Sequence, residues 1–303
     1  MAERRTAVVT GVCGYVASHL AKTLDKAGWR VFGIDRAGLP DEAWSAVPAD
    51  RRLAFDGHDF GALLDFTARA RPTAVFHLAA AFLRQDTYDC VMDVSASNLQ
   101  FSMAMLDACH RVPCCVFVNT GSHWQHYRNA DFSPVDAYAA TKRAFQVMVE
   151  SYVELHGLRA TTLTLFDPYG EDDRRDKLIP NLVRAVQAHR AIDISAGEQE
   201  VDFVHVDDVS AAYVAAFELL ASDKRVRPEY GVSAGRPRRL RDLLSAVLGD
   251  RTDAVVNFGA RPYRRREVMT VWRNFETVPG WSPRHDVVRD LSALFRSAGG
   301  GRS

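Results

Sequence analysis

A glycine-rich turn between an apolar run and a helical pattern is the feature that most restricts how this chain can fold. The run Thr6–Thr10 is rich in β-branched residues and leads directly into Gly11 and Gly14, and a helical pattern begins at Tyr15. In this arrangement the backbone N–H groups of the turn and the positive end of the helix point at one place, which suits a pyrophosphate. Taken alone, the turn also fits an ordinary strand-to-helix connection.

A carboxylate one strand later favours a dinucleotide site. Asp35 ends the second predicted strand, 24 residues after Gly11, where a carboxylate can accept hydrogen bonds from both hydroxyls of an adenosine ribose. Arg36, beside it, could instead hold a 2′-phosphate through two hydrogen bonds. The combination predicts a site for NAD, with NADP as the alternative.

Strand and helix patterns alternate through the first half of the chain. Such alternation indicates βαβ units and therefore an α/β fold with a Rossmann-type, doubly wound parallel sheet. Shorter elements follow, interrupted by Pro and Gly, so we expect a dinucleotide-binding domain over 1–167 and a smaller C-terminal substrate-binding lobe over 168–303, with 201–220 returning to the first domain. The predicted strands are Thr6–Thr10, Arg30–Asp35, Leu53–Phe55, Thr73–His77, Cys114–Asn119 and Thr161–Leu165. The predicted helices are Tyr15–Ala27, Asp59–Ala70, Val94–His110 and Asp136–Gly157.

Composition argues against several other classes of protein. Lys plus Arg and Asp plus Glu number 38 each, so the chain lacks the basic excess that favours binding to nucleic acid or to an anionic membrane surface. No apolar run approaches the ~18 residues of a membrane span, and no targeting segment is expected before the first strand. The five cysteines are odd in number and lack metal-ligand spacing, so neither a disulfide framework nor a metal site is expected. A cytoplasmic, reduced protein is the expectation.

A tyrosine and a lysine four residues apart predict proton-transfer chemistry. Tyr138 and Lys142 fall on one face of a predicted helix, and Ser122 follows a strand at the carboxyl end of the predicted sheet. An ammonium beside a phenol should lower the phenol pKa from its usual value of ~10 towards the operating pH. We expect Tyr138 to exchange a proton with the substrate, Lys142 to tune it and Ser122 to hold the substrate oxygen. An exposed helical pair without a catalytic role is the alternative.

With further short motifs, these residues resemble the extended short-chain dehydrogenase/reductases of the NAD(P)-dependent epimerase/dehydratase type, which act on nucleotide sugars. The resemblance extends from Thr10 to about Asp290 and implies a nucleotide-sugar substrate. Combined with the glycine turn, it assigns to the cofactor Gly11, Cys13, Gly14, Tyr15, Val16, Asp35, Arg36, Asp56, Gly57, Leu78, Ala79, Ala80, Asn98, Tyr138, Lys142 and Phe166. It assigns to the substrate Ser122, His123, Trp124, Asp167, Tyr169, Lys177 and Arg266.

Two positions depart from the family pattern. Members often carry an asparagine and an arginine that address the sugar-nucleotide diphosphate, where this chain has Asp167 and Val201. Because an acidic side chain that faces a diphosphate is unfavourable, we expect Lys177 or the run Arg264–Arg266 to supply the positive charge. A solvated surface run is the alternative for the three arginines.

A closer resemblance is to the CDP-abequose synthase branch, which reduces the 4-keto group of a CDP-3,6-dideoxyhexose. It rests on the segments Asn119–Tyr127, Ser133–Pro134, Leu165–Gly170 and Lys177–Pro180. It implies an NAD(P)-dependent reductase of a 4-keto sugar nucleotide. The alternatives are a 4-epimerase or dehydratase that retains its NAD, and a non-catalytic protein that senses dinucleotides.

Two predicted helices carry more apolar bulk than one sheet face requires. These are Val94–His110 and Asp136–Gly157, and their apolar side chains are expected to face outwards and form a homodimer interface. The side chains in question are Phe101, Met105, Phe145, Met148 and Tyr152. Core packing is the alternative, while the family resemblance also implies a dimer.

Overall fold

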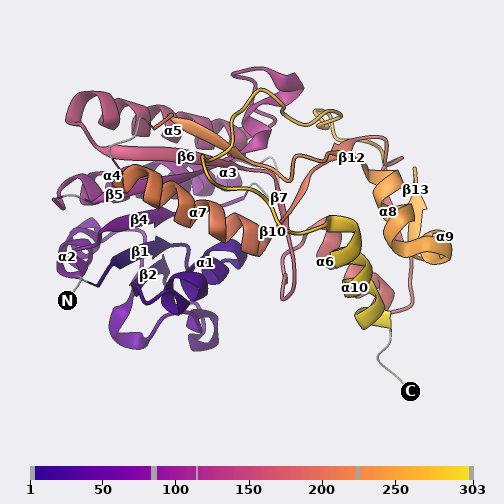
Figure 1. The fold of residues 1–303 in the computed structure, drawn as a ribbon, viewed down its shortest axis with the longest axis horizontal. Helices are drawn as coiled ribbons and strands as arrows, with labels where there is room; N and C mark the ends of the chain where they lie inside the picture. Colours follow the sequence, from indigo (N-terminus) through magenta and orange to yellow (C-terminus); the bar gives the residue numbers. More distant parts are fainter. Residues whose placement is uncertain (1–3, 83–86, 114, 223–225, 300–303) are drawn as a thin grey trace.

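The computed structural model describes residues 4–82, 87–113, 115–222 and 226–299. Its main feature is a parallel sheet of seven strands in the order β11-β6-β5-β4-β1-β2-β3, with a smaller lobe beside it (Figure 1). The strand order reverses between β1 and β4, and ligands of doubly wound sheets bind at such a point. The strands are β1 Thr6–Thr10, β2 Arg30–Arg36, β3 Arg52–Phe55, β4 Ala74–His77, β5 Val116–Ser122, β6 Arg159–Leu165 and β11 Glu229–Val232. The predicted fold class is confirmed.

Helices cover both faces of this sheet, because its strands are apolar on both sides. Successive residues of β1 show the alternation: Val9 packs in one apolar cluster and Val8 in the other. On the first face lie α1 Tyr15–Lys26 and α7 Val206–Ala221, which also contact each other. On the second face lie α2 Phe60–Ala70, α4 Ser102–His110 and α5 Ala137–His156. The sheet is thus packed between helices on both faces.

Local sequence explains the ends of α5. Asp136 is its N-cap and accepts a hydrogen bond from the Ala139 N–H at 2.8 Å. Gly157 ends it in the left-handed conformation, with φ of 64°. The predicted range Asp136–Gly157 is therefore the helix together with its two caps.

Two features differ from the predicted elements. The single helix expected over Val94–His110 is instead α3 Tyr88–Ser95, a π-helical segment over Ala96–Phe101 and then α4. Strand β11 was not predicted, and it pairs with β6 at the edge of the large sheet. Cys114, the first residue of one predicted strand, lies outside the described residues, and β5 begins at Val116.

The smaller lobe has its own apolar cluster, in which Leu182, Leu243 and Phe295 are fully buried. Its strands pair in twos: β7 Asp167–Tyr169 with β10 Phe203–His205, β8 Ile192–Ile194 with β13 Val256–Phe258, and β9 Glu200–Val201 with β12 Arg238–Arg239. Its helices are α6 Leu178–Gln187, α8 Leu240–Leu248, α9 Thr252–Val255 and α10 Val287–Gly299. Short 3₁₀ turns occur in this lobe at Gly249–Arg251 and elsewhere at Asp41–Trp44, Ala49–Arg51, His123–Gln125 and Tyr127–Asn129.

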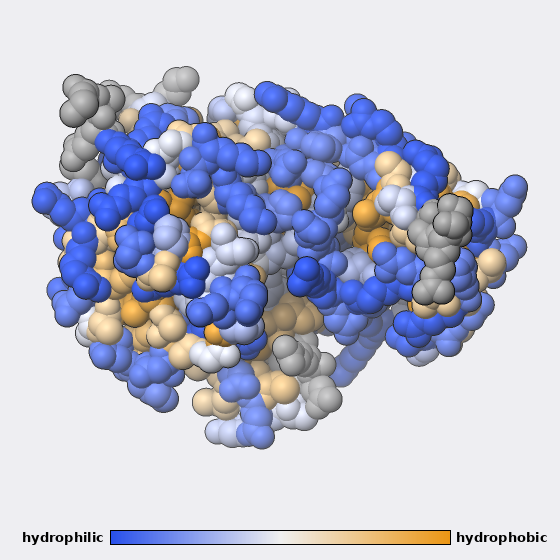
Figure 2. All heavy atoms as spheres, turned by 90° about the horizontal axis from the view of Figure 1, so that it is seen from below, coloured by the Kyte–Doolittle hydropathy of each residue, from blue (hydrophilic) through white to orange (hydrophobic). Residues whose placement is uncertain are grey.

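The apolar residues expected at a dimer interface are divided between core and surface. Met105 and Phe145 do not face outwards as predicted, because the faces of α4 and α5 that carry them pack against the sheet. Met148 is exposed, as are Tyr88 and Leu155 on α3 and α5. Polar side chains cover most of the face shown in Figure 2, with smaller separate apolar patches. Within the described ranges, no helix is both long and apolar enough to cross a lipid bilayer.

Candidate active site

The glycine turn fits tightly against the end of β4. Gly11 has a φ of +66°, and a Cβ atom there would lie 2.8 Å from the Cα of Ala79. Gly14 is the N-cap of α1, and its N–H donates to the Gly11 carbonyl at 2.8 Å. Only glycine satisfies both the backbone conformation and the close approach at position 11. The turn therefore leaves a bare backbone surface at the N-terminus of α1, as a pyrophosphate requires.

Asp35 connects β2 to this turn. One carboxylate oxygen accepts from the Cys13 N–H at 2.8 Å, and the other accepts from the Arg36 N–H at 2.8 Å. Burial, and next the Asp35 charge, raise the pKa of the Cys13 thiol to about 12, so this thiol stays protonated. The side chain of Asp35 is half-buried and Arg36 is exposed. Each carboxylate oxygen keeps a further lone pair, which a ribose hydroxyl can use.

The loop after β4 forms the next wall. Thr10 Oγ1 accepts from the N–H groups of Leu78 and Ala79 at 3.2 and 3.1 Å. Asn98, in the π-helical segment, accepts from the Ala81 N–H at 2.8 Å and donates to the Ala81 carbonyl at 3.0 Å. Asn98 therefore holds the backbone of this loop in place through Ala81. Ala80, between these residues, is exposed.

Asp56 and Gly57, which were predicted to contact the cofactor, lie just beyond β3. The Asp56 carboxylate accepts from the N–H groups of Asp59 and His58 at 2.9 and 2.8 Å, and these hydrogen bonds lower its pKa. Gly57 has a φ of +91° in the same turn. Asp56 is fully exposed and remains accessible to a ligand.

Ser122, Tyr138 and Lys142 come from the end of β5 and the start of α5. Burial, and next the charge of Asp136, raise the pKa of Tyr138 to about 12, while the Ser122 hydroxyl and Arg175 act in the opposite direction. Lys142 is only 2% exposed, and burial lowers its pKa to about 8. The expected lowering of the Tyr138 pKa is therefore wrong for this structure. Loss of water around the phenolate outweighs the Ser122 hydrogen bond and the charge of Arg175.

The low pKa of Lys142 predicts a pH limit on activity. The pH dependence of kcat/KM reports groups of the free enzyme, so the rate should fall as the pH rises through about 8 and the Lys142 ammonium loses its charge. Lys142→Met removes this group, and its residual kcat/KM should lack that alkaline limb. A wild-type profile that stays flat well above this pH would contradict the assignment.

An aromatic and cationic cluster adjoins Tyr138. The Phe82 ring lies 4.9 Å from the Tyr138 ring and 5.6 Å from the Trp124 ring. Lys177 Nζ lies 3.8 Å from the centre of the Phe82 ring, and the Arg264 guanidinium lies 5.5 Å from that of Trp124. Phe82, which is 41% exposed, was not predicted, because an isolated aromatic residue in a loop gives no sequence signal.

Asp167 is surrounded by positive or polarised groups. His123 Nε2 lies 3.7 Å from its carboxylate. Burial by itself raises the pKa of Asp167, but His123, Lys177 and Arg175 outweigh this effect and lower the pKa. The expected conflict between this carboxylate and a diphosphate is therefore reduced, because the chain supplies the neutralising charge itself.

His123 and Phe166 belong to a stack of parallel rings. The two rings lie 5.0 Å apart with planes 8° apart, and Phe166 continues the stack to Trp272. His123 is 5% exposed, and among the described residues neither of its ring nitrogens has a hydrogen-bond partner. Phe166 is also buried.

Arg175 is a second residue that the sequence interpretation missed. Its guanidinium lies 4.4 Å from the centre of the Tyr15 ring, at the start of α1. Asp173 and the Pro168 carbonyl hold it through hydrogen bonds of 2.8 Å. It therefore joins the segment after β7 to the dinucleotide turn. Val16, the neighbour of Tyr15, packs against the core.

Two predicted substrate residues have other partners. Tyr169 is buried in the smaller lobe, and its hydroxyl donates to Asp290 at 3.1 Å. Arg266 donates to the Ser133 hydroxyl at 2.8 Å and lies 4.3 Å from the centre of the Tyr127 ring. Of the run Arg264–Arg266, Arg264 is therefore the residue that contacts Trp124, in the aromatic and cationic cluster beside Tyr138.

One group of three residues brings metal-ligand atoms together within the described ranges. Side-chain atoms of His205, Asp207 and His285 lie within 4.8 Å of one another. The two imidazoles are stacked, however, with ring centres 3.7 Å apart and planes 6° apart, so an ion in the plane of one ring lies far outside the plane of the other. His205 Nδ1 also accepts from the Asp207 N–H at 3.2 Å. We assign no metal to this group.

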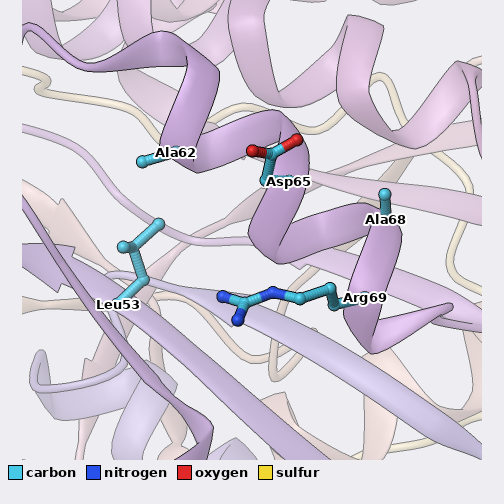
Figure 3. A pocket seen from close by; sticks show the side chains of 5 residues that line it. All are labelled: Leu53, Ala62, Asp65, Ala68 and Arg69. Carbon is cyan, nitrogen blue, oxygen red and sulfur yellow. The ribbon is translucent and has the colours of Figure 1, made fainter.

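A surface hollow between β3 and α2 lies apart from the predicted site residues. Leu53, Asp65 and Arg69 line it with two alanines, and Figure 3 shows the Arg69 guanidinium directed towards Leu53. None of the residues predicted to bind cofactor or substrate contributes to it. The candidate active site is therefore the one built at the ends of β1, β2, β4 and β5.

Comparison with known proteins gives related results at three levels. A family model described as the NAD dependent epimerase/dehydratase family matches residues 7–228. CDP-abequose synthase of Salmonella typhimurium is 24% identical over 297 residues, which cover 95% of this chain and 97% of that protein. UDP-glucose 4-epimerase of Corynebacterium glutamicum is 27% identical over 326 residues, covering 98% and 97%. The crystal structure of Thermus thermophilus UDP-glucose 4-epimerase in complex with NAD has a TM-score of 0.81 at 21% identity, covering 98% of this chain and 100% of that one.

The structural likeness concerns the fold, because the sequence identity to the Thermus protein is low. The family match covers most of the chain and includes the glycine turn, Ser122, Tyr138 and Lys142. The chain therefore belongs to the NAD dependent epimerase/dehydratase family.

Proposed function

We propose that this protein is an NAD-dependent oxidoreductase that reduces the 4-keto group of a nucleoside-diphosphate deoxyhexose. The observation that carries the proposal is that Ser122 ends β5 at the same edge of the parallel sheet as the glycine turn after β1, with Tyr138 and Lys142 near the start of α5. The full-length similarity to CDP-abequose synthase supports a reductase within the family. The smaller lobe, 168–303 apart from 201–220, is proposed to bind the substrate.

The residues present fit a bound dinucleotide. Gly11 leaves the cradle that a Cβ atom would fill, and Asp35 keeps acceptor capacity for the ribose hydroxyls. When bound, NADH supplies the hydride. Tyr138 donates a proton to the keto oxygen, Ser122 donates a hydrogen bond to that oxygen, and the charged Lys142 stabilises the phenolate that remains.

The substrate is proposed to lie along the cluster beside Tyr138. Lys177 and Arg264 would pair with the diphosphate, and Trp124 and Phe82 would cover the sugar. Asp167 would accept a hydrogen bond from a sugar hydroxyl.

A 4-epimerase is the second candidate, because the Corynebacterium UDP-glucose 4-epimerase is similar over nearly the whole chain. An epimerase restores its nicotinamide within each turnover and has no need to exchange it, whereas a reductase consumes a reduced cofactor. Mass analysis of purified protein, followed by two assays, separates the two: a 4-keto-6-deoxy nucleotide sugar with NADH or NADPH, and a 4-hydroxy nucleotide sugar with no added cofactor. Epimerisation of the 4-hydroxy sugar without external cofactor, and no oxidation of NADH or NADPH with the 4-keto sugar, would reject the reductase.

The choice between NAD and NADP is proposed to depend on Asp35 and Arg36. The Asp35 charge favours ribose hydroxyls and repels a 2′-phosphate, so Asp35→Asn, which removes this charge, should weaken NADH binding. Arg36→Ala should mainly weaken NADPH binding. Asparagine is preferred to alanine here because its oxygen can still accept from the Cys13 N–H. Titration of each variant with both cofactors measures the effect, and equal losses for NADH and NADPH in both variants would contradict it.

A homodimer is also proposed, through α5 as predicted and, in place of the helix predicted over Val94–His110, through the preceding helix α3. Tyr88, Met148 and Leu155 leave apolar surface exposed there, which burial against a second copy would remove from water. Light scattering that shows only monomer at micromolar concentration would contradict this proposal.

A further inference from the structure

Two buried glutamines connect Ser122 with the helix that carries Tyr138 and Lys142. Gln125 and Gln146 are both fully buried. The Ser122 backbone N–H donates to Gln125 Oε1 at 2.8 Å, and Gln125 Nε2 donates to Gln146 Oε1 at 2.8 Å. Gln146 lies on α5 one turn beyond Lys142, so this chain of amides spans from the end of β5 to the catalytic helix.

Carboxylates fix the direction of the chain of amides. Gln146 Nε2 donates to Glu150 Oε1 at 3.2 Å. Burial by itself raises the pKa of Glu229, but hydrogen bonds from His126, Thr164 and Gln146 outweigh it and keep the carboxyl ionised. The ionised Glu229 carboxylate only accepts, so Gln146 must direct its NH₂ group at this carboxylate and its carbonyl at Gln125. Gln125 then has only its carbonyl to offer to Ser122.

The surroundings leave Gln125 little room to turn away. A Cβ atom at Gly121 would lie 2.5 Å from Thr164 Oγ1 and 3.0 Å from Gln125 Oε1, so the amide is packed against the strand backbone. Ser122 Oγ in turn accepts from the Trp124 N–H at 3.3 Å. Ser122 is therefore hydrogen-bonded to two residues of the turn His123–Gln125, through its side chain to Trp124 and through its backbone N–H to Gln125.

We propose that Gln125 and Gln146 are positioning residues that hold Ser122 in register with Tyr138. The inference rests on the proposed catalytic role of Ser122, and it adds a second pair of residues on which that role depends. Neither glutamine touches the reacting atoms. Their effect on the rate would pass through the placement of the Ser122 hydroxyl, and small displacements of such a group cost much of its contribution.

The test is a double-mutant cycle. Gln146→Leu keeps most of the buried volume but removes the acceptor of Gln125, and kcat should fall about 10-fold while the KM for cofactor changes less than about two-fold. In a Ser122→Ala background, the same change should lower kcat by less than about two-fold, because no hydroxyl remains to be placed. The proposal would be overturned if Gln146→Leu lowers kcat equally in both backgrounds, or if it does not lower kcat in the protein that keeps Ser122.

Two further variants test whether a loss of kcat comes from misfolding or from the removal of any buried glutamine. If Gln146→Leu fails to fold because Gln125 is left unpaired, the pair Gln125→Leu with Gln146→Leu removes both amides together and should show the same loss of kcat. Gln199→Leu is the matched control, since Gln199 is a buried glutamine of the smaller lobe whose amide donates to Ser195 at 3.2 Å. Its kcat should remain near that of the wild type.

Crystal structures of the wild type and of Gln146→Leu give a readout that needs no substrate. The Ser122 side chain should move, or lose its single conformation, relative to Tyr138 in the variant. An unchanged Ser122 would overturn the positioning role even if the enzyme is active. If the wild type turns over no nucleotide sugar, the proposed function fails, and this comparison still decides the role of the glutamines.

Discussion

Tyr138→Phe should lower kcat by about 100-fold or more, the range expected when a general acid is removed. The phenylalanine keeps the ring that packs against Phe82 but lacks the hydroxyl that would protonate the substrate oxygen. Cofactor affinity should stay close to that of the wild type, because the glycine turn and Asp35 are untouched. Steady-state kinetics and a cofactor titration on the same preparation measure both quantities.

Tyr152→Phe is the matched control for this change. Tyr152 lies on the same helix, and its ring packs edge-on against His110 and His156, away from the candidate site. Its loss of a hydroxyl should leave kcat unchanged. Full activity in Tyr138→Phe, with native cofactor affinity, would remove Tyr138 from the mechanism.

Gly11→Ala should abolish cofactor binding at ordinary concentrations. The new Cβ would lie 2.8 Å from the Cα and 2.9 Å from the backbone N of Ala79, and neither backbone atom can move aside as a flexible side chain could. The turn or the loop after β4 must shift, and both form the walls of the dinucleotide site. Calorimetric titration with NAD or NADH measures the loss.

Gly157→Ala separates the two effects of an alanine at position 11, which are backbone strain and close contact with Ala79. Gly157 has a φ of +64°, almost equal to the +66° of Gly11, but a Cβ atom there meets nothing within 4 Å. It should therefore cost only the strain of a left-handed residue, roughly 1–2 kcal/mol of folding stability, without loss of cofactor binding. If Gly11→Ala binds NAD as well as Gly157→Ala does, the close approach to Ala79 has no role in the site.

The parts of the candidate site that the sequence predicted are those whose residues lie close together in the chain. A helix places residues four apart on one face, so the spacing of Tyr138 and Lys142 was enough to predict that both lie on one face of α5. A strand, a glycine turn and a helix in succession likewise predict a phosphate cradle, and the residues 6–26 form that unit. The break in the helix predicted over Val94–His110 contains Asn98, whose hydrogen bonds to Ala81 join two separate segments, and helical periodicity carries no signal of such a contact.

The amino-acid sequence by itself determined the doubly wound sheet and predicted the glycine turn and the candidate residues Ser122, Tyr138 and Lys142, because periodicity and turn chemistry act between near neighbours in the chain. Only the tertiary structure decided the pKa of Tyr138, the neighbours of Asp167 and the link from Ser122 to Gln146. Burial and contact between segments far apart in sequence control these properties. The charge state of a phenol depends on how much water the packed neighbours exclude, and that is fixed when the helices and strands come together.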